Sequence, residues 1–292
     1  MAEKKAVALG LFDGVHLGHR AVISRPVSMA AQGLVPGVFT FRNTTLAYKQ
    51  GRSIEYIYTD SYKERLVRRL GISEVFSEDF RELRELSGEE FARDILSRRL
   101  GVACVVCGTD FRFGRNASCG INELAELGKK YGFAAEVADD VTADGENISS
   151  KRIRALLREG SPEKAALLLG EKYTVSGETV YGNQIGRTID FPTVNQLFEE
   201  GQLVPKCGVY SSSVAIDGTE YRAVTNIGVK PTIAGERSPL AETHILGFSG
   251  DLYGRYLEVR LNSFIRPEQK FSSLEELRSQ IQQDISFAEK DI

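Results

Sequence analysis

In the first half of the chain, short apolar runs alternate with longer amphipathic stretches. The apolar runs predict buried strands at residues 6–9, 37–41, 102–106 and 133–137. The stretches between them predict helices over residues 21–32, from Ser61, from Ser87 to about Leu100, and over residues 121–131. Pro26 predicts a kink or a late start in the first helix, because proline removes a helix hydrogen bond. Such alternation predicts a doubly wound parallel sheet, whose ligands bind at the carboxyl ends of the strands.

The pattern changes from Tyr173 onward, after a predicted closing helix and linker at residues 160–170. Alternating short strands are predicted at residues 209–216, 221–226, 242–248 and 256–261, and Asp217-Gly218 is a strong hairpin signal. These strands predict a small antiparallel barrel. A last helix is predicted from the capping-box pattern at Ser273, with an apolar stripe of Leu274, Leu277, Ile281 and Ile285. We therefore expect an α/β domain over residues 1–170 and an all-β domain with a terminal helix over residues 171–292.

A glycine-rich turn, G-L-F-D-G-V-H-L-G-H, follows the first predicted strand and leads into a predicted helix. Glycine lets the backbone turn tightly and approach a ligand, and the free N–H groups of a helix start favour a phosphate. His16 and His19 lie three residues apart at that helix entrance, where an imidazole can stabilise charge on a phosphate. A strand, a glycine turn, H-x-G-H and a helix resemble the first signature of the nucleotidyltransferase superfamily.

Two later segments are candidates for the same site. In the segment Gly108–Gly114, Phe111 and Phe113 flank Arg112 and can stack a flat ring, or simply plug the end of the sheet; the residues alone favour neither. In I-S-S-K-R-I-R, residues 148–154, Ser149 is a plausible N-cap, and hydroxyl and basic groups at a helix start suit a polyphosphate. Taken alone, this second segment is better explained as a capped surface helix with a solvated basic face.

The chemical segment of the second half is G-N-Q-I-G-R-T-I-D-F-P-T-V-N, residues 182–195. Its glycines free the backbone to close over phosphates. Thr193 and Asn195 are hard oxygen donors two residues apart, able to hold a magnesium ion together with ATP phosphates. By itself P-T-x-N is a weak pattern that is more often a loop than a metal site.

Composition narrows the class of protein without choosing a reaction. The chain has 292 residues, 42% hydrophobic and 26% charged, with a formal net charge of −3, so charge gives no reason to expect a nucleic-acid partner. No apolar segment follows the N-terminus, which predicts a cytoplasmic protein with no membrane span. Cys104 and Cys107 form a C-x-x-C in an apolar run without a second ligand pair, and this setting predicts a buried strand with reduced thiols.

The three motifs of the first half together resemble the bacterial bifunctional riboflavin kinase/FAD synthetase family, in the order G-x-F-D-G-x-H-x-G-H, G-x-D-F-R-F-G, I-S-S-x-x-I-R. The second half resembles the family's G-R-x-x-G-F-P-T-A-N signature, and further matches cover residues 205–210, 226–232, 242–246 and 266–271. The resemblance implies a Rossmann-like nucleotidyltransferase domain followed by a riboflavin-kinase barrel. It also implies riboflavin, FMN, FAD and ATP as ligands, with magnesium and with ATP as co-substrate.

The resemblance assigns roles to residues that the bare patterns leave open. Glu242 of the E-x-H segment corresponds to the catalytic base of the kinase, with Thr193 and Asn195 as metal ligands. His16 and His19 correspond to catalytic residues of the adenylyltransferase. The resemblance implies ATP contacts at Gly10, Phe12, Gly14, Ser149, Ser150, Arg154, Gly182, Gly186 and Arg187. It implies flavin contacts at Asp110, Phe111, Arg112, Phe113, Arg266 and Glu268.

The chain departs from the family pattern at four places. Lys151 replaces a threonine, Asp190 replaces a glycine, Val194 replaces an alanine, and Phe41-Arg42-Asn43-Thr44 stands where Pro-His-Pro is usual. The main prediction is an enzyme that phosphorylates riboflavin to FMN and adenylylates FMN to FAD, releasing pyrophosphate. The alternatives are a riboflavin kinase with a vestigial adenylyltransferase domain, a non-catalytic flavin-binding regulator, and another cytidylyl- or adenylyltransferase.

Overall fold

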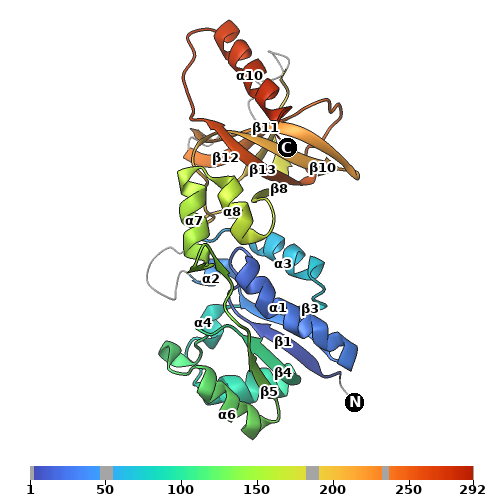
Figure 1. The fold of residues 1–292 in the computed structure, drawn as a ribbon, viewed down its shortest axis with the longest axis vertical. Helices are drawn as coiled ribbons and strands as arrows, with labels where there is room; N and C mark the ends of the chain where they lie inside the picture. Colours follow the sequence, from blue (N-terminus) through green and yellow to red (C-terminus); the bar gives the residue numbers. More distant parts are fainter. Residues whose placement is uncertain (1–2, 47–54, 182–190, 232–236, 292) are drawn as a thin grey trace. The chain divides into compact units, whose positions relative to one another are not determined.

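The computed structural model describes residues 3–46, 55–181, 191–231 and 237–291. It divides into two compact units, residues 1–150 and 151–292 (Figure 1). Each unit has its own sheet and its own core, so each is described by itself.

The first unit is built on a five-stranded parallel sheet in the order β3-β2-β1-β4-β5. Its strands are β1 (Lys5–Leu9), β2 (Val35–Phe41), β3 (Glu74–Glu78), β4 (Val102–Cys107) and β5 (Ala134–Val137). Strand β1 is central, paired to β2 and β4, and its Ala6, Val7 and Ala8 are fully buried. A run buried on both faces is what the continuous apolar pattern predicts for a parallel strand. The predicted doubly wound sheet is confirmed.

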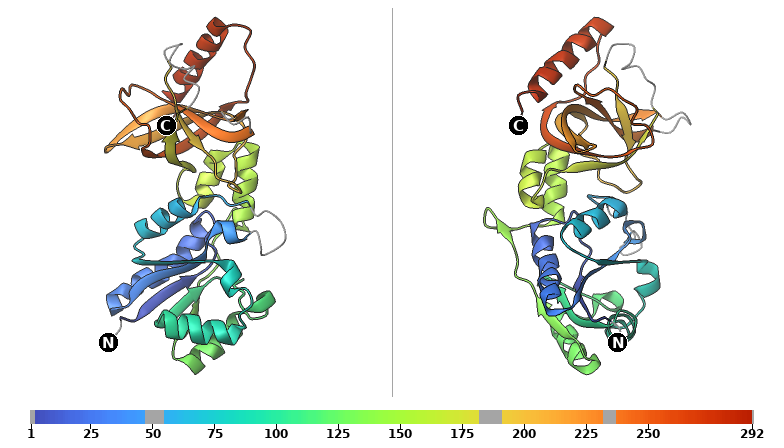
Figure 2. Two further views of the ribbon diagram at one scale, coloured as in Figure 1. Left: turned by 180° about the vertical axis from the view of Figure 1, so that it is seen from behind. Right: turned by 90° about the vertical axis from the view of Figure 1, so that its right-hand side faces the viewer.

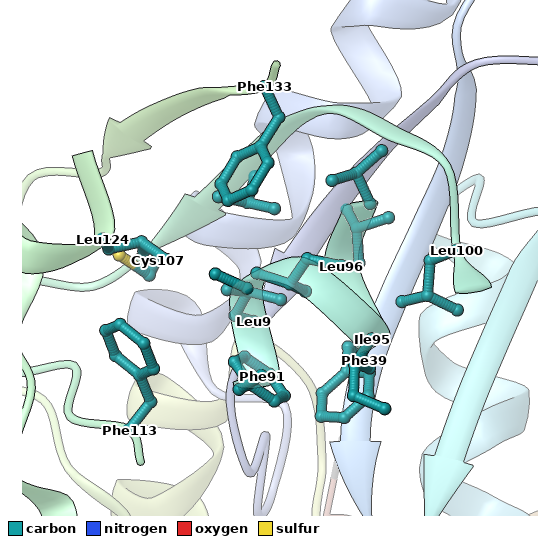
Figure 3. Close-up of a cluster of buried hydrophobic side chains, with 14 residues drawn as sticks. Leu9, Phe39, Phe91, Ile95, Leu96, Leu100, Cys107, Phe113, Leu124 and Phe133 are labelled. Carbon is teal, nitrogen blue, oxygen red and sulfur yellow. The ribbon is translucent and has the colours of Figure 1, made fainter. Parts of the chain in front are cut away.

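Helices cover both faces of this sheet (Figures 1 and 2). The longer ones are α1 (Leu17–Met29), α3 (Asp60–Arg69), η3 (Phe91–Arg99) and α6 (Ile121–Tyr131). Short turns of helix are η1 (Ala30–Gln32), α2 (Asn43–Leu46), α4 (Phe80–Leu83), α5 (Gly88–Glu90) and η4 (Arg115–Ala117). Helices η3 and α6 pack Phe91, Leu96 and Leu124 against Leu9 and Phe39 of the sheet, as Figure 3 shows. A two-stranded ribbon, β6 (Thr142–Ala143) and β7 (Glu146–Asn147), completes the unit.

Two predictions about helix starts in this unit were wrong. Helix α1 begins at Leu17, four residues before the predicted start, because His16 caps it, and it continues through Pro26 to Met29. Helix α3 is capped by Thr59 and not by Ser61, since the Thr59 hydroxyl accepts from the backbone N–H of Tyr62. Threonine is also a favoured capping residue, so the capping-box pattern at Ser61 did not identify the true cap. The capping box at Ser87 is confirmed.

The prediction that Cys104 and Cys107 lie in a buried strand is also confirmed. Cys104 and Cys107 lie in β4 and are buried, and burial raises the pKa of each thiol to about 11. Thiols held neutral in this way are poor nucleophiles and poor metal ligands. Among the described residues, no group of three or more His, Cys, Asp and Glu side chains is arranged to hold a metal ion.

The second unit consists of two helices, a closed antiparallel barrel and a terminal helix. The helices are α7 (Ser150–Glu159) and α8 (Pro162–Leu169). The barrel has the order β10-β11-β12-β9-β8-β13 and closes on itself, which is plain in the right-hand view of Figure 2. Its strands are β8 (Thr174–Val180), β9 (Val194–Leu197), β10 (Gly208–Ile216), β11 (Thr219–Pro231), β12 (Arg237–Ile245) and β13 (Tyr256–Arg266). Closure leaves no unpaired sheet edge.

The predicted hairpin between β10 and β11 is confirmed. Asp217 and Gly218 have φ of 50° and 83°, and Ile216 pairs with Thr219. A two-residue turn with both central residues at positive φ matches the twist of the flanking strands. The strand predicted to end at Phe248 instead ends at Ile245.

The terminal helix α10 (Leu274–Ala288) is capped by Ser273 as predicted, but its apolar stripe is only partly used. Ile285 and Ala288 are buried against Val209 and Val224 of the barrel, with Ile281 packed beside them. Leu274 is 58% exposed, so the part of the stripe in the first turn is not buried. The helix therefore meets the barrel with its C-terminal half.

Candidate functional site

The turn that follows β1 holds an unusual backbone. Phe12, Gly14 and Val15 have φ of 51°, 83° and 44°. Positive φ is costly for a β-branched residue such as Val15, and such strain gathers at sites where structure is fixed for function. The side chains of Phe12 and Val15 are buried and anchor the turn to the core. A Cβ on Gly10 would lie 2.9 Å from the Phe12 ring, so glycine is needed there.

Three hydrogen bonds fix this turn to neighbouring segments. The Asp13 carboxylate accepts from the backbone N–H of Ile57 at 2.7 Å, and the Thr40 hydroxyl donates to the Leu11 carbonyl at 3.0 Å. The Ser150 hydroxyl donates to the Asp13 carbonyl at 2.8 Å. The last bond joins two predicted motifs that are 137 positions apart in sequence. The structure therefore brings Ser150 to the Gly10–His19 turn.

His16 and His19 form a stacked pair at the start of α1. Their ring centroids are 3.6 Å apart at an interplanar angle of 17°. Nδ1 of His16 accepts from the backbone N–H of His19 at 3.3 Å, so His16 caps the helix. Phe12 packs its ring edge-on against His19, with centroids 5.4 Å apart. Gly18 allows this arrangement, since a Cβ there would lie 3.2 Å from the His16 ring.

Burial keeps both imidazoles neutral in this structure. It lowers the pKa of His16 from 6.5 to about 4. Burial also lowers the pKa of His19 well below 6.5, with smaller contributions from the charges of His16 and Lys63. The Nδ1 atom of His19 is buried and has no hydrogen-bond partner among the described residues. The pair thus offers polar groups, held in one orientation, at the N-terminus of a helix.

Lys63 is a buried cation close to this pair that the sequence reasoning missed. Its side chain is 3% exposed, and its ammonium donates to the Phe41 carbonyl at 3.0 Å and to Asn43 Oδ1 at 3.2 Å. Asp60 pairs with it at 3.1 Å. Lys63, Phe12 and Thr40 also line a hollow of about 240 Å³. In the sequence, Lys63 stands in the S-Y-K-E stretch, which matches a capping box and so predicts a helix start and not a buried cation.

The Gly108–Gly114 segment divides into a core half and an exposed half. Phe113 is 7% exposed and belongs to the core cluster of Figure 3. Phe111 stacks on it with centroids 5.9 Å apart and is half-buried. Asp110 and Arg112 are exposed, and Arg112 donates to the Ala117 carbonyl at 3.2 Å. Plugging the sheet end therefore accounts for Phe113, while the other three remain candidates for a flavin contact.

The third motif spans the start of α7. Ser150 is the first residue of that helix, Ser149 precedes it, and Lys151 is exposed. Lys151 and Arg154 belong to the second unit. Ser150 reaches the turn through its hydroxyl, which donates to the Asp13 carbonyl.

In the second unit, two candidate side chains, Asn195 and Glu242, share one row across three strands with Asn226. Asn195 of β9 pairs with Glu242 of β12, and Glu242 pairs with Asn226 of β11. Directly opposite residues of neighbouring strands project from the same face of a sheet. The neighbours Ala241 and Thr243 are buried on the other face, toward the barrel interior. The row therefore lies on the outer face of the barrel.

Asn195 has an unsatisfied acceptor. Its side chain is 4% exposed, yet Oδ1 has no hydrogen-bond partner among the described residues. A buried amide oxygen without a partner is costly unless a ligand satisfies it. Thr193 lies two residues before it. The predicted ATP contacts at Gly182, Gly186 and Arg187, and the departure at Asp190, lie outside the described residues.

His244 ties the P-T segment to β12, a role that sequence reasoning did not assign. Its Nδ1 lies 2.8 Å from the Pro192 carbonyl, and the Phe191 ring packs edge-on at 5.5 Å between centroids. The available signal was the E-x-H spacing, since residues two apart on a strand share a face. His244 thereby holds the stretch that leads to Thr193 and Asn195.

The two predicted flavin residues of the 266–271 segment, Arg266 and Glu268, differ in whether they contact this row. Glu268 accepts from the side-chain amide of Asn226 at 3.4 Å. Arg266 is engaged elsewhere, in a bidentate pair with Asp284 of α10. The structure thus brings Glu268, but not the Arg266 guanidinium, to the row.

Comparison with known proteins agrees with this arrangement. Residues 1–152 match the FAD synthetase family and residues 169–292 match the riboflavin kinase family. Proteins from Listeria monocytogenes (34% identical), Pseudomonas fluorescens (35%) and Escherichia coli K12 (34%) are named bifunctional riboflavin kinase/FMN adenylyltransferase. The matches cover 96%, 96% and 95% of this chain and 90% of each relative.

A solved structure is similar over nearly the whole chain. A crystal structure from Streptococcus pneumoniae, described as a macrolide-efflux protein, has a TM-score of 0.83 at 28% identity and covers 99% of this chain and 95% of its own. In this chain, none of the described helices combines the length and apolar character that crossing a bilayer requires.

The fold and the two sites define a two-domain protein with a nucleotidyltransferase-type parallel sheet and a kinase-type barrel. The chain belongs to the bifunctional riboflavin kinase/FMN adenylyltransferase family. The family matches end at residue 152 and begin at residue 169, and the compact units divide after Ser150. A functional boundary at residues 170/171 stays a prediction.

Proposed function

We propose that this chain makes FAD from riboflavin in two steps, each using one ATP. The barrel transfers the γ-phosphoryl group of ATP to riboflavin, giving FMN and ADP. The parallel-sheet domain then joins FMN to the AMP part of a second ATP and releases pyrophosphate. The observation that carries the proposal is the pairing of Glu242 with Asn195 across β12 and β9, which puts a carboxylate beside an unsatisfied amide oxygen.

In the kinase step, Glu242 acts as the general base. A ribityl hydroxyl of riboflavin is a poor nucleophile, and a positioned carboxylate accepts its proton as the oxygen bonds to the γ-phosphorus. The bond from the γ-phosphorus to the bridging oxygen breaks, and that oxygen leaves with ADP. Thr193 and Asn195 would hold a magnesium ion, and the unpartnered Oδ1 of Asn195 fits a hard cation. When bound, magnesium neutralises charge on the ATP phosphates.

In the adenylyl step, no protein nucleophile is needed because the FMN phosphate is already ionised. An FMN phosphate oxygen bonds to the α-phosphorus of ATP while the bond to the β-phosphate oxygen breaks. His16 and His19 donate hydrogen bonds to the phosphate oxygens on which charge develops. Gly10, Phe12 and Gly14 shape the ATP site, and Ser149, Ser150 and Arg154 hold the departing pyrophosphate. Phe111, between the exposed Asp110 and Arg112, offers a stacking surface for the flavin ring.

The test is a product analysis. The protein is incubated with riboflavin, ATP and magnesium, and FMN and FAD are separated and quantified over time. Accumulation of both supports the proposal. If FMN forms but FAD does not, even when FMN is supplied directly, the chain is better explained as a kinase with a vestigial first domain. The departure from the family pattern at Lys151 is the feature that motivates this alternative.

A matched variant assigns the base. We expect Glu242→Gln to abolish most FMN formation, while FAD formation from supplied FMN persists. The glutamine keeps the size and polarity of the side chain but cannot accept the proton, so a change of fold is not needed to explain the loss. If Glu242→Gln forms FMN at the rate of the unmodified chain, Glu242 is not the base.

A further inference from the structure

The 266–271 segment is anchored at its first residue by a buried ion pair. Arg266 donates from Nε to Asp284 Oδ1 at 3.0 Å and from Nη2 to Oδ2 at 2.7 Å, while Nη1 donates to the Pro267 carbonyl at 3.2 Å. The Phe271 ring lies 5.8 Å from the guanidinium carbon. All three guanidinium nitrogens of Arg266 are thus bonded within the protein. This side chain is built to hold the segment more than to contact a ligand.

Asp284 is the fixed end of this anchor. It is 2% exposed, lies in α10 beside the buried Ile285, and also accepts from Gln280 Nε2 at 3.1 Å. A buried carboxylate is stable only while its partner stays in place, because taking a lone charge out of water is costly. The fork of Arg266 gives the pair a single geometry. The position of α10 therefore determines where the segment starts.

Glu268 is the residue of the 266–271 segment that contacts the barrel strand β11. Its carboxylate approaches β11 closely and accepts from Asn226 Nδ2 at 3.4 Å. A Cβ on Gly228 would overlap the Glu268 carboxylate, so the glycine leaves the space it occupies. Asn226 is the cross-strand neighbour of Glu242. A continuous line of contacts thus runs from α10 through Arg266 and Glu268 to the row that carries the proposed base.

We infer that Asp284 is a positioning residue for riboflavin phosphorylation: through Arg266 it sets the 266–271 segment so that Glu268 meets Asn226 beside Glu242. The inference rests on the proposed kinase function. It gives α10 a part in the kinase site through the Asp284–Arg266 pair. It also makes Asn226 the residue through which the segment reaches the base.

The test is a double-mutant cycle between Asp284→Asn and Glu268→Gln in the full chain. Each single variant should lower kcat/KM for riboflavin about ten- to a hundredfold, the loss expected for a shift of roughly 1 Å in a site. The loss should appear mainly in the KM for riboflavin, with the KM for ATP unchanged. Because Asp284 acts through Glu268, the kcat/KM of the double variant for riboflavin should lie within about twofold of that of the more impaired single variant.

Asp217→Asn is the matched control. Asp217 forms a bidentate pair with Arg255 in the same barrel, with contacts of 2.6 and 3.1 Å, but on the exposed β10–β11 hairpin. Asparagine tolerates the positive φ of this position, so the turn is kept. Both kinase constants should be unchanged in this control. FAD formation from supplied FMN should be unchanged in every variant.

The outcomes separate the inference from the proposed function. Losses that multiply in the double variant, or a normal kcat/KM in Asp284→Asn, would overturn the positioning role. If Asp284→Asn does not fold, the same cycle is run with Arg266→Lys, which keeps the charge but not the fork. If the unmodified chain makes no FMN, the kinase proposal fails. The cycle is then measured as riboflavin dissociation constants by flavin fluorescence, and independent effects there overturn the inference.

Discussion

The neutral histidine pair predicts a loss of stability in mild acid that is confined to the first unit. In the folded chain the pKa of His16 is about 4, whereas its ordinary value is 6.5. Between these values the unfolded chain binds a proton that the folded chain does not, so stability falls as pH falls and is fully present above pH 6.5. The difference of about 2.5, at about 1.36 kcal/mol per unit, gives about 3.4 kcal/mol for His16 alone.

Most other groups do not interfere in this pH window. The carboxylates with depressed pKa, such as Asp79, lose their contribution only below their ordinary values near 4. His19 acts in the same direction as His16, because burial also lowers its pKa. Between about pH 4.5 and 6, His16 should contribute a slope of up to about 1.4 kcal/mol per pH unit, the value for one proton, and His19 adds to it in the same direction.

His16→Asn tests this reasoning without removing the helix cap, since asparagine is among the best capping residues. The assay is hydrogen exchange of peptides from β1 and α1, corrected for intrinsic rates and converted to opening free energies at several pH values. The variant should lose the His16 contribution, up to about 1.4 kcal/mol per pH unit, and keep a smaller slope in the same direction from His19. Peptides from the barrel serve as the internal reference. Equal slopes in the two proteins would refute the assignment of a depressed pKa to His16.

Three further predictions concern other positions. Lys151→Ala should make FAD more slowly than the unmodified chain with FMN formation unchanged, because an ammonium can bind the departing pyrophosphate. If Lys151→Ala makes FAD at the rate of the unmodified chain and Lys151→Thr makes it much faster, Lys151 impairs the adenylyl step. A fragment of residues 151–292 should phosphorylate riboflavin and unfold at a higher temperature than residues 171–292, because the longer one keeps the buried Leu157, Leu168 and Leu169; equal melting temperatures would contradict this. Gly228→Ala should raise the KM for riboflavin with little change in melting temperature, because the added Cβ displaces the flexible Glu268 side chain; an unchanged KM would count against it.

The fold could be predicted from the sequence wherever the hydrophobic pattern of a segment matches its burial in the structure. The apolar runs gave the central strands within two residues, and Asp217-Gly218 gave the hairpin, because each signal has one physical cause. Helix starts were less predictable. His16 is seldom expected as a cap, so the true start of α1 at Leu17 was missed.

The site was predictable only as far as its motifs are contiguous. His16 and His19 lie in one string, and Thr193 and Asn195 in another, so the sequence alone could single out both pairs as candidates. Lys63 was missed because what makes it notable is its burial near Phe41 and Asn43, which comes from tertiary packing. The ion pair of Arg266 with Asp284 was missed for the same reason, since the two residues lie 18 positions apart.

The two units solve the problem of positioning polar groups by different means. In the first, a short strained turn places the histidines, and the strain is stabilised locally by buried Phe12 and Val15 and by the bonds of Asp13. In the second, strand register aligns Asn195, Glu242 and Asn226, so no residue of the row needs an unusual backbone. A register cannot shift by one residue without turning the whole row to the other face. Substitutions near the turn should therefore change activity gradually through small shifts in geometry. Substitutions that disturb the pairing of β9, β12 and β11 should remove the proposed kinase site as a unit.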